Sequence, residues 1–287
     1  MFTRPPLRVA RQLSFQFPSH STRGLMRQVI ALFALTLLAL SAQAEEEFPG
    51  RRQYPAVEYI ELQDFYQKLN EEKIVAVDVR TDYEYNTLHI KGAVNISLTS
   101  DTFIDDMKIL QGMHKDKKLA LYCNGKTCLK SYKAASKCRK YHINDIVVYD
   151  AGVFDFAKAY PNDTYLFGEV LGDPSRLIGK DKLLSHSISI PEFEEKILQT
   201  NGIVLDVRDK QQRDGISIFY MRERRASLDR PDLIDRYISQ AKKRGVPLLI
   251  YDQAGKQVRW LQYYLEKQQV PSYFFMAGGI DEYFKTL

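Results

Sequence analysis

The chain contains little of what stabilises small secreted or fibrous proteins. Three cysteines among 287 residues are too few for a disulfide scaffold. Fifteen glycines and eleven prolines exclude collagen-like and low-complexity classes. The remainder, 45% hydrophobic and 27% charged, is ordinary globular composition, and the length predicts two domains. We expect no metal ion and no cofactor.

Outside the amino terminus the chain carries no net positive charge. Residues 1–44 contain five arginines and no acidic residue, so they account for the whole net charge of +5. A nearly neutral body offers no broad field for phosphates, and nucleic acid is therefore not an expected partner. The short run Arg222, Arg224 and Arg225 is interpreted as a solvated loop or helix face.

Only one long apolar run is present, and it has the pattern of an export signal. Arg23 and Arg27 precede the apolar stretch 29–40, and the small residues Ala42 and Ala44 follow it. This run is shorter than the roughly 20 residues that span a bilayer. We therefore predict a signal peptide at 1–44, cleavage before residue 45, and a periplasmic mature protein that is not embedded in the membrane. An uncleaved anchor is the alternative, and Met26 is a second candidate start.

The body of the chain repeats itself after about 128 residues, the size of a duplicated domain. Each copy has short β-branched runs that alternate with helical stripes, which predicts two α/β domains, each with a small, mostly parallel sheet flanked by helices. The expected strands are 74–80, 119–122 and 146–149 in the first copy and 203–208, 248–251 and 273–276 in the second. The expected boundaries are a linker at 45–55, a catalytic domain at 56–161, a linker at 162–184 and a second domain at 185–287.

The chemistry is expected where strand 119–122 runs into Cys123. Ligands of open α/β sheets bind at the carboxyl ends of strands, and a strand–loop–helix junction directs backbone N–H groups at one point. We expect this cradle to lower the pKa of Cys123 and make it the nucleophile, with Lys126 and Lys130 adding positive charge. The loop residues predicted to bind substrate are Asn124, Gly125, Lys126, Thr127 and Cys128.

Two separate motifs resemble the rhodanese family. One is the loop 122–128, Tyr-Cys-Asn-Gly-Lys-Thr-Cys, and the other runs from Asp78-Val-Arg80 through Glu84 to the stretch 89–96, His-Ile-Lys-Gly-Ala-Val-Asn-Ile. The resemblance covers about 56–161 well and 185–287 more weakly. It implies a sulfurtransferase whose cysteine becomes a persulfide, with small sulfur-containing anions as donors and a thiol or cyanide as acceptor.

The loop also argues against a related chemistry. Six positions from Cys123 to Cys128 are typical of family members that handle sulfur, whereas phosphatase relatives have longer loops. A phosphatase also needs an arginine six residues after the cysteine to clamp phosphate, and Leu129 occupies that position.

The supporting residues have simpler interpretations. Asp78 and Arg80 could brace the loop as an ion pair, but simple support of the fold is the favoured interpretation; Gly152 is expected to give the backbone freedom where it passes the site. Cys138 falls on an apolar stripe and is interpreted as inert core. Cys128 is left open: it is a polar loop residue, or it forms a disulfide with Cys123 or resolves a persulfide there.

The second copy lacks the nucleophile. Asp252 stands where Cys123 stands in the first copy, and a carboxylate does not carry a transferable sulfur. We therefore interpret 185–287 as an inactive domain. Two functions remain in competition: a sulfurtransferase with one site, and a non-catalytic or redox-sensing module that binds an unknown protein partner and uses Cys123 and Cys128.

Overall fold

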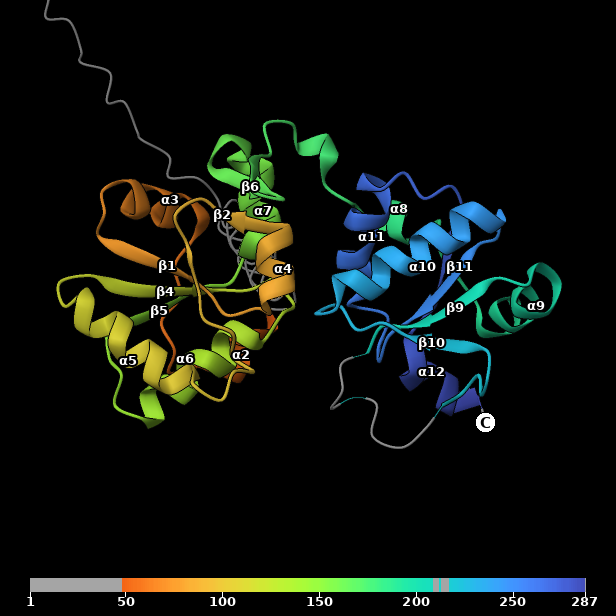
Figure 1. The fold of residues 1–287 in the computed structure, drawn as a ribbon. Coiled ribbons are helices and arrows are strands. Elements are labelled where there is room, and N and C mark those ends of the chain that lie inside the picture. The colour runs from red at the N-terminus through yellow and green to blue at the C-terminus, as the bar shows by residue number, and fades with distance from the viewer. Residues whose placement is uncertain (1–47, 209–211, 213–216, 287) are drawn as a thin grey trace, which may run out of the picture. The chain divides into compact units, whose positions relative to one another are not determined.

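Two parallel sheets organise the computed structural model, which describes residues 48–208, 212 and 217–286 (Figure 1). The predicted signal peptide, residues 1–44, lies outside the described residues. Both predicted sheets are present, and each has its own hydrophobic core. Residues 49–287 form one compact unit.

The first sheet has four parallel strands in the order β3-β1-β4-β5. The strands are buried on both faces, which is why they are apolar and β-branched without alternation and could be identified from sequence. A parallel bridge between Tyr59 and Val148 extends the β5 edge. The strands are β1 (Ile74–Asp78), β3 (Val94–Asn95), β4 (Lys118–Tyr122) and β5 (Ile146–Tyr149).

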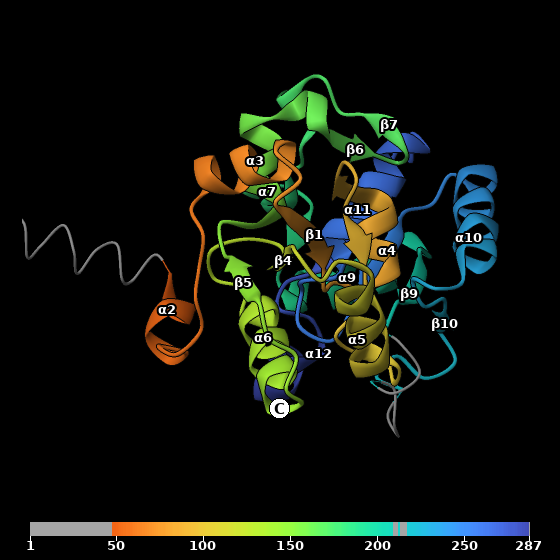
Figure 2. The ribbon, with the colours of Figure 1, turned by 90° about the vertical axis from the view of Figure 1, so that its left-hand side faces the viewer.

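Helices cover both faces of this sheet (Figures 1 and 2). Leu119 and Leu121 of the central strand β4 point into the core beneath α5 (Phe103–Met113) and α6 (Lys130–Lys140). On the opposite face, Phe65 of α3 (Leu62–Asn70) stacks on Tyr149 at a centroid distance of 4.3 Å and meets Phe156 of α7 (Gly152–Ala159) edge-on. The short helix α4 (Asp82–Thr87) begins with a capping box between Thr81 and Glu84.

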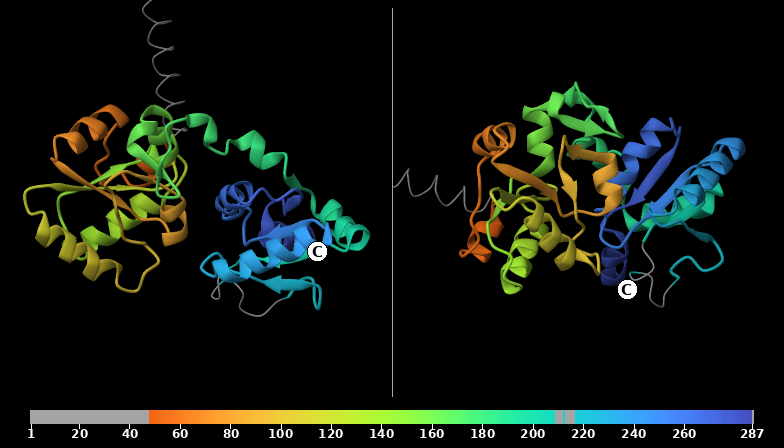
Figure 3. Two further views of the ribbon diagram at one scale, coloured as in Figure 1. Left: turned by 45° about the horizontal axis from the view of Figure 1, so that its top comes forward. Right: turned by 60° about the vertical axis from the view of Figure 1, so that its left-hand side comes forward.

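The second sheet repeats this arrangement with five parallel strands in the order β10-β9-β11-β12-β8 (Figure 3). Its core residues come from α10 and α11 on one face and from α9 and α12 on the other. The strands are β8 (Ser187–Ile188), β9 (Ile203–Asp206), β10 (Glu223–Arg225), β11 (Leu248–Tyr251) and β12 (Tyr273–Met276); the helices are α9 (Ile190–Thr200), α10 (Pro231–Arg244), α11 (Val258–Lys267) and α12 (Gly279–Thr286).

The segment predicted as a linker at 45–55 is structured from residue 49. It forms α2 (Pro49–Gln53), and Arg51 makes ion pairs with Asp150 and Glu61, both at 2.8 Å. Gly50 lies against the ring of Tyr132. The prediction was wrong here because these anchoring partners are remote in sequence.

The second predicted linker, 162–184, is also largely structured. After η1 (Pro161–Asp163), the strand β6 (Thr164–Leu166) pairs antiparallel with β2 (Leu88–Ile90) and with β7 (Glu169–Val170). Further on, the Ile178 N–H donates to Tyr263 Oη at 2.8 Å, so this part packs on α11. The connection between the two sheets is therefore shorter than the predicted linker. It consists of the residues around η2 (Pro174–Arg176), and α8 (Lys180–Leu184) follows it.

The arginine run is exposed to solvent, as expected, and Arg222 lies in a turn. Arg224 and Arg225, however, lie in β10, an edge strand, rather than in a loop or a helix. In the described part of the chain, none of the helices combines the length and the apolar character needed to cross a membrane.

Candidate active site

The loop after β4 begins at Cys123 and turns immediately before α6. The Cys128 N–H donates to the Gly125 carbonyl at 2.8 Å, which closes the turn. The start of α7 holds the other side, because the Val153 N–H donates to the Cys123 carbonyl at 2.9 Å. The predicted loop thus lies at the carboxyl end of a central strand, clamped between the amino-terminal ends of two helices.

Gly152 makes this clamp possible. Its φ is +72°, and a Cβ atom placed on it would lie 2.4 Å from the Gly125 nitrogen and 2.6 Å from the Asn124 carbonyl carbon. Both contacts are with backbone, which has little room to move. The structure therefore confirms that the backbone at Gly152 must be free of a side chain where it passes the loop.

The thiol of Cys123 is fully buried in this arrangement. Its Sγ donates to the Cys128 carbonyl at 3.2 Å and lies 3.6 Å from Ser131 Oγ. Burial, followed by the hydrogen bond to Cys128, raises the pKa of Cys123 well above its usual value. The direction is opposite to the lowered pKa expected from the sequence, because burial outweighs the hydrogen bonds of Ser131, which act to lower it.

The lowered pKa belongs to Cys128 instead. A side-chain hydrogen bond from Cys123 is the largest contribution, and the N–H groups of Lys130 and Asn124 add to it against a smaller opposing effect of burial. Together they lower the pKa of Cys128 to about 6. The pKa values of the two neighbouring sulfurs thus move in opposite directions, and the more accessible Cys128 is the one that ionises more readily.

A buried network braces the loop from the side of β1. Arg80 donates to both carboxylate oxygens of Asp78, with Nη2 to Oδ2 at 2.5 Å, and both side chains are inaccessible to solvent. Arg80 Nη1 also donates to Asn124 Oδ1 at 3.2 Å. The predicted ion pair is therefore present, and it holds the loop through Asn124.

Glu84, which lies within the second motif, completes the brace. Its carboxylate accepts from Asn124 Nδ2 at 3.0 Å and lies 3.3 Å from Lys130 Nζ. Burial opposes ionisation, but the charges of Lys130 and Arg80 outweigh it and lower the pKa of Glu84. Sequence reasoning also missed Ser131, whose only signal was its place on the buried stripe of α6.

The remaining loop residues lie closer to solvent. Lys126 is half-buried and forms an ion pair with Asp155 at 3.6 Å, so part of its charge is balanced. Thr127 is exposed. Cys138, by contrast, is buried on α6, and burial raises its pKa to about 12, in agreement with an inert core role.

The equivalent loop of the second sheet is filled by its own side chain. Asp252 follows β11, is buried, and accepts from the N–H groups of Gln257 at 2.5 Å and Val258 at 3.2 Å, and also from that of Gly255. Gly279 repeats the role of Gly152, with φ +62° and a hypothetical Cβ only 2.6 Å from the Asp252 carbonyl. The cradle persists here, but a carboxylate occupies the place of the thiol.

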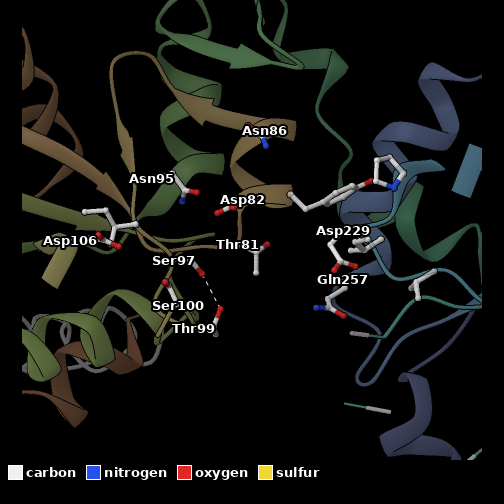
Figure 4. Close-up of a pocket in the computed structure, with 15 residues that line it drawn as sticks. Thr81, Asp82, Asn86, Asn95, Ser97, Thr99, Ser100, Asp106, Asp229 and Gln257 are labelled. Carbon is white, nitrogen blue, oxygen red and sulfur yellow. Dashed lines mark hydrogen bonds between the residues drawn. The ribbon is translucent and has the colours of Figure 1, made fainter. Parts of the chain in front are cut away.

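A cavity of about 770 Å³ lies outside the loop 123–128, and its lining includes Thr81, Asn95 and Ser97 (Figure 4). Asn95 holds the backbone next to the brace, since its Nδ2 donates to the carbonyls of Asp78 and Arg80. Neither loop cysteine lines this cavity. Across residues 48–208, 212 and 217–286, no group of three or more His, Cys, Asp or Glu side chains is arranged to hold a metal ion.

Comparison with known proteins gives the family of the first sheet. A family model for the rhodanese-like domain matches residues 61–159. Residues 61–159 are a rhodanese-like domain. The match confirms the resemblance drawn from the two motifs and indicates sulfurtransferase-type chemistry. It does not extend to the second sheet, whose inactive-domain interpretation stays a prediction.

The proteins to which the chain is similar carry different names. A tRNA uridine(34) hydroxylase of Bacillus cereus (strain Q1) is 26% identical over 163 residues, 49% of each chain. One from Bdellovibrio bacteriovorus is 31% identical over 91 residues, 32% of this chain and 25% of that protein. The match thus spans about half the length of the Bacillus cereus relative and about a quarter of the Bdellovibrio bacteriovorus relative. Among solved structures, a thiosulfate sulfurtransferase from Pseudomonas aeruginosa is 14% identical with a TM-score of 0.33, covering 78% of this chain and 43% of that one.

Proposed function

We propose that this protein is an exported sulfurtransferase, in which Cys123 takes sulfane sulfur from thiosulfate or a similar anion and passes it to a thiol or cyanide. The observation that supports this most is the braced six-residue loop within the rhodanese-like domain, with a cysteine at its first position on the end of β4. The proposed periplasmic location is supported by the signal-peptide pattern of residues 1–44.

The first step forms the persulfide. Cys123 reacts as a thiolate, so its thiol first loses a proton to a base in solution. Cys123 Sγ then attacks the outer sulfur of thiosulfate; the sulfur–sulfur bond of the donor breaks, and sulfite leaves with the electron pair. Lys126 and Lys130 raise the local concentration of the dianion. An acceptor thiol or cyanide removes the outer sulfur in the second step.

Sulfite release tests the proposal directly, because it reports the first step whatever happens to the persulfide afterwards. We expect the purified protein to release one sulfite per chain from thiosulfate, and thiocyanate when cyanide is present. Cys123→Ser is expected to abolish both, whereas Cys138→Ala serves as the matched cysteine control and keeps both. Sulfite release by Cys123→Ser would place the nucleophile elsewhere.

The cysteine pair also favours the second candidate, a redox-sensing module that binds a protein partner. Two thiols in hydrogen-bond contact within one turn can be oxidised to a disulfide with a short movement. This function would be supported if thiosulfate released no sulfite while a mild oxidant removed two hydrogens from the Cys123 and Cys128 pair.

A further inference from the structure

Cys128 is a second reactive thiol that the single-cysteine reaction does not use as a nucleophile. It lies at the sixth position of the loop and packs on the same core cluster that contains Cys123. The turn closed by the Cys128 N–H and the Gly125 carbonyl keeps the two residues together. Cys123 Sγ donates to the Cys128 carbonyl at 3.2 Å, so Cys128 lies next to the sulfur that would carry the persulfide.

We propose that Cys128 resolves the Cys123 persulfide and releases hydrosulfide, an inference that rests on the proposed sulfurtransferase function. The Cys128 thiolate attacks Cys123 Sγ and forms the Cys123–Cys128 disulfide. The bond between Cys123 Sγ and the outer sulfur breaks, and hydrosulfide leaves with the electron pair. An external thiol reductant then supplies two electrons and two protons to restore both thiols.

The environment of each sulfur favours this direction of attack. The pKa of Cys128 is lowered first by the hydrogen bond from Cys123, and the N–H groups of Lys130 and Asn124 and the charge of Lys130 act in the same direction, which favours Cys128 as the attacking thiolate. Attack on the outer sulfur would expel Cys123 as a thiolate into a fully buried position, where burial disfavours the charge. Attack on Cys123 Sγ expels hydrosulfide and leaves no buried Cys123 thiolate, and the leaving group that carries its charge more easily leaves faster.

Accessibility points the same way. Cys123 is fully buried, whereas Cys128 is partly exposed. A protein thiol or other bulky acceptor therefore reaches Cys128 before it reaches Cys123. A disulfide that includes Cys128 offers that exposed sulfur to a reductant, and a persulfide confined to Cys123 does not.

The experiment compares the wild-type protein, Cys128→Ala and the matched control Cys138→Ala after thiosulfate is added without reductant. Sulfite and hydrosulfide are measured, and the intact mass of each protein is recorded. We expect the wild type and Cys138→Ala to release both products in equal amounts and to lose the mass of two hydrogens, which dithiothreitol restores. We expect Cys128→Ala to release sulfite alone and to keep the mass of one added sulfur.

The two proposals fail in different ways. If no protein releases sulfite, the sulfurtransferase function is refuted and the resolving step with it. If the wild type releases sulfite but keeps the added sulfur as stably as Cys128→Ala, the function stands and the resolving role of Cys128 is overturned. Limited alkylation with iodoacetamide at neutral pH gives a second test: we expect Cys128 to be modified before Cys123, and the reverse order contradicts the assignment of the thiolate.

Discussion

Gly152→Ala tests whether the close approach of α7 sets the active loop. The substituted Cβ would lie 2.4 Å from the Gly125 nitrogen, so either the loop or the start of α7 has to move. An L-residue in the left-handed region costs about 1–2 kcal/mol, and overpacking typically adds about 1–3 kcal/mol. We therefore expect the free energy of unfolding, measured in urea, to fall by roughly 2–5 kcal/mol. We also expect sulfite release from thiosulfate to be lost.

Alanine substitutions at two other glycines separate the cost of the positive φ from the cost of the close contact. Gly92 has φ +76° and no atom within 4 Å of its hypothetical Cβ, so Gly92→Ala carries the backbone cost alone, about 1–2 kcal/mol. Gly279→Ala brings the same kind of contact to the Asp252 loop and should destabilise like Gly152→Ala while keeping sulfite release. Equal losses of stability in Gly152→Ala and Gly92→Ala, or normal sulfite release by Gly152→Ala, would refute the argument.

Two further variants test the charges around the loop. Glu84→Gln removes the carboxylate that binds Asn124 and Lys130, so we expect a loss of about 1–3 kcal/mol in unfolding free energy. It should also lower the alkylation pKa of Cys128, because Lys130 then acts on the thiolate alone; an unchanged or higher value would argue against this coupling. Lys126→Glu should raise the KM for thiosulfate by roughly two- to tenfold at low salt, with a smaller effect at high salt because Lys126 is only half-buried. A salt-independent effect would contradict capture of the donor by charge.

The sheets could be predicted because their signals are local. A parallel strand buried on both faces is a continuous apolar run, and β1, β4, β5, β9, β11 and β12 all fall on such runs. The stripe of Ser131, Ala134 and Cys138 likewise located α6. By contrast, β6 has only three residues and pairs with β2, more than 70 positions earlier, so its local pattern carries no such signal.

The position of the reactive loop was also predictable, but its charge distribution was not. The order of strand, cysteine and glycine fixes where Cys123 lies. Which sulfur carries the charge depends on burial and on contacts with the Cys128 carbonyl and Ser131, which appear only in three dimensions. The same holds for Glu84, which reaches Asn124 across 40 residues of sequence.

The two loops together show that one backbone arrangement can hold either a reactive cysteine or an unreactive carboxylate. Each loop turns tightly between a strand and a helix, and each relies on a glycine with positive φ opposite the loop. In the second sheet, the first loop position is Asp252, a carboxylate that accepts the loop N–H groups and has no sulfur to give. In the first, the same position is Cys123, with Cys128 beside it at the end of the loop. The difference in expected chemistry therefore comes from which side chain fills the cradle rather than from the fold that builds it.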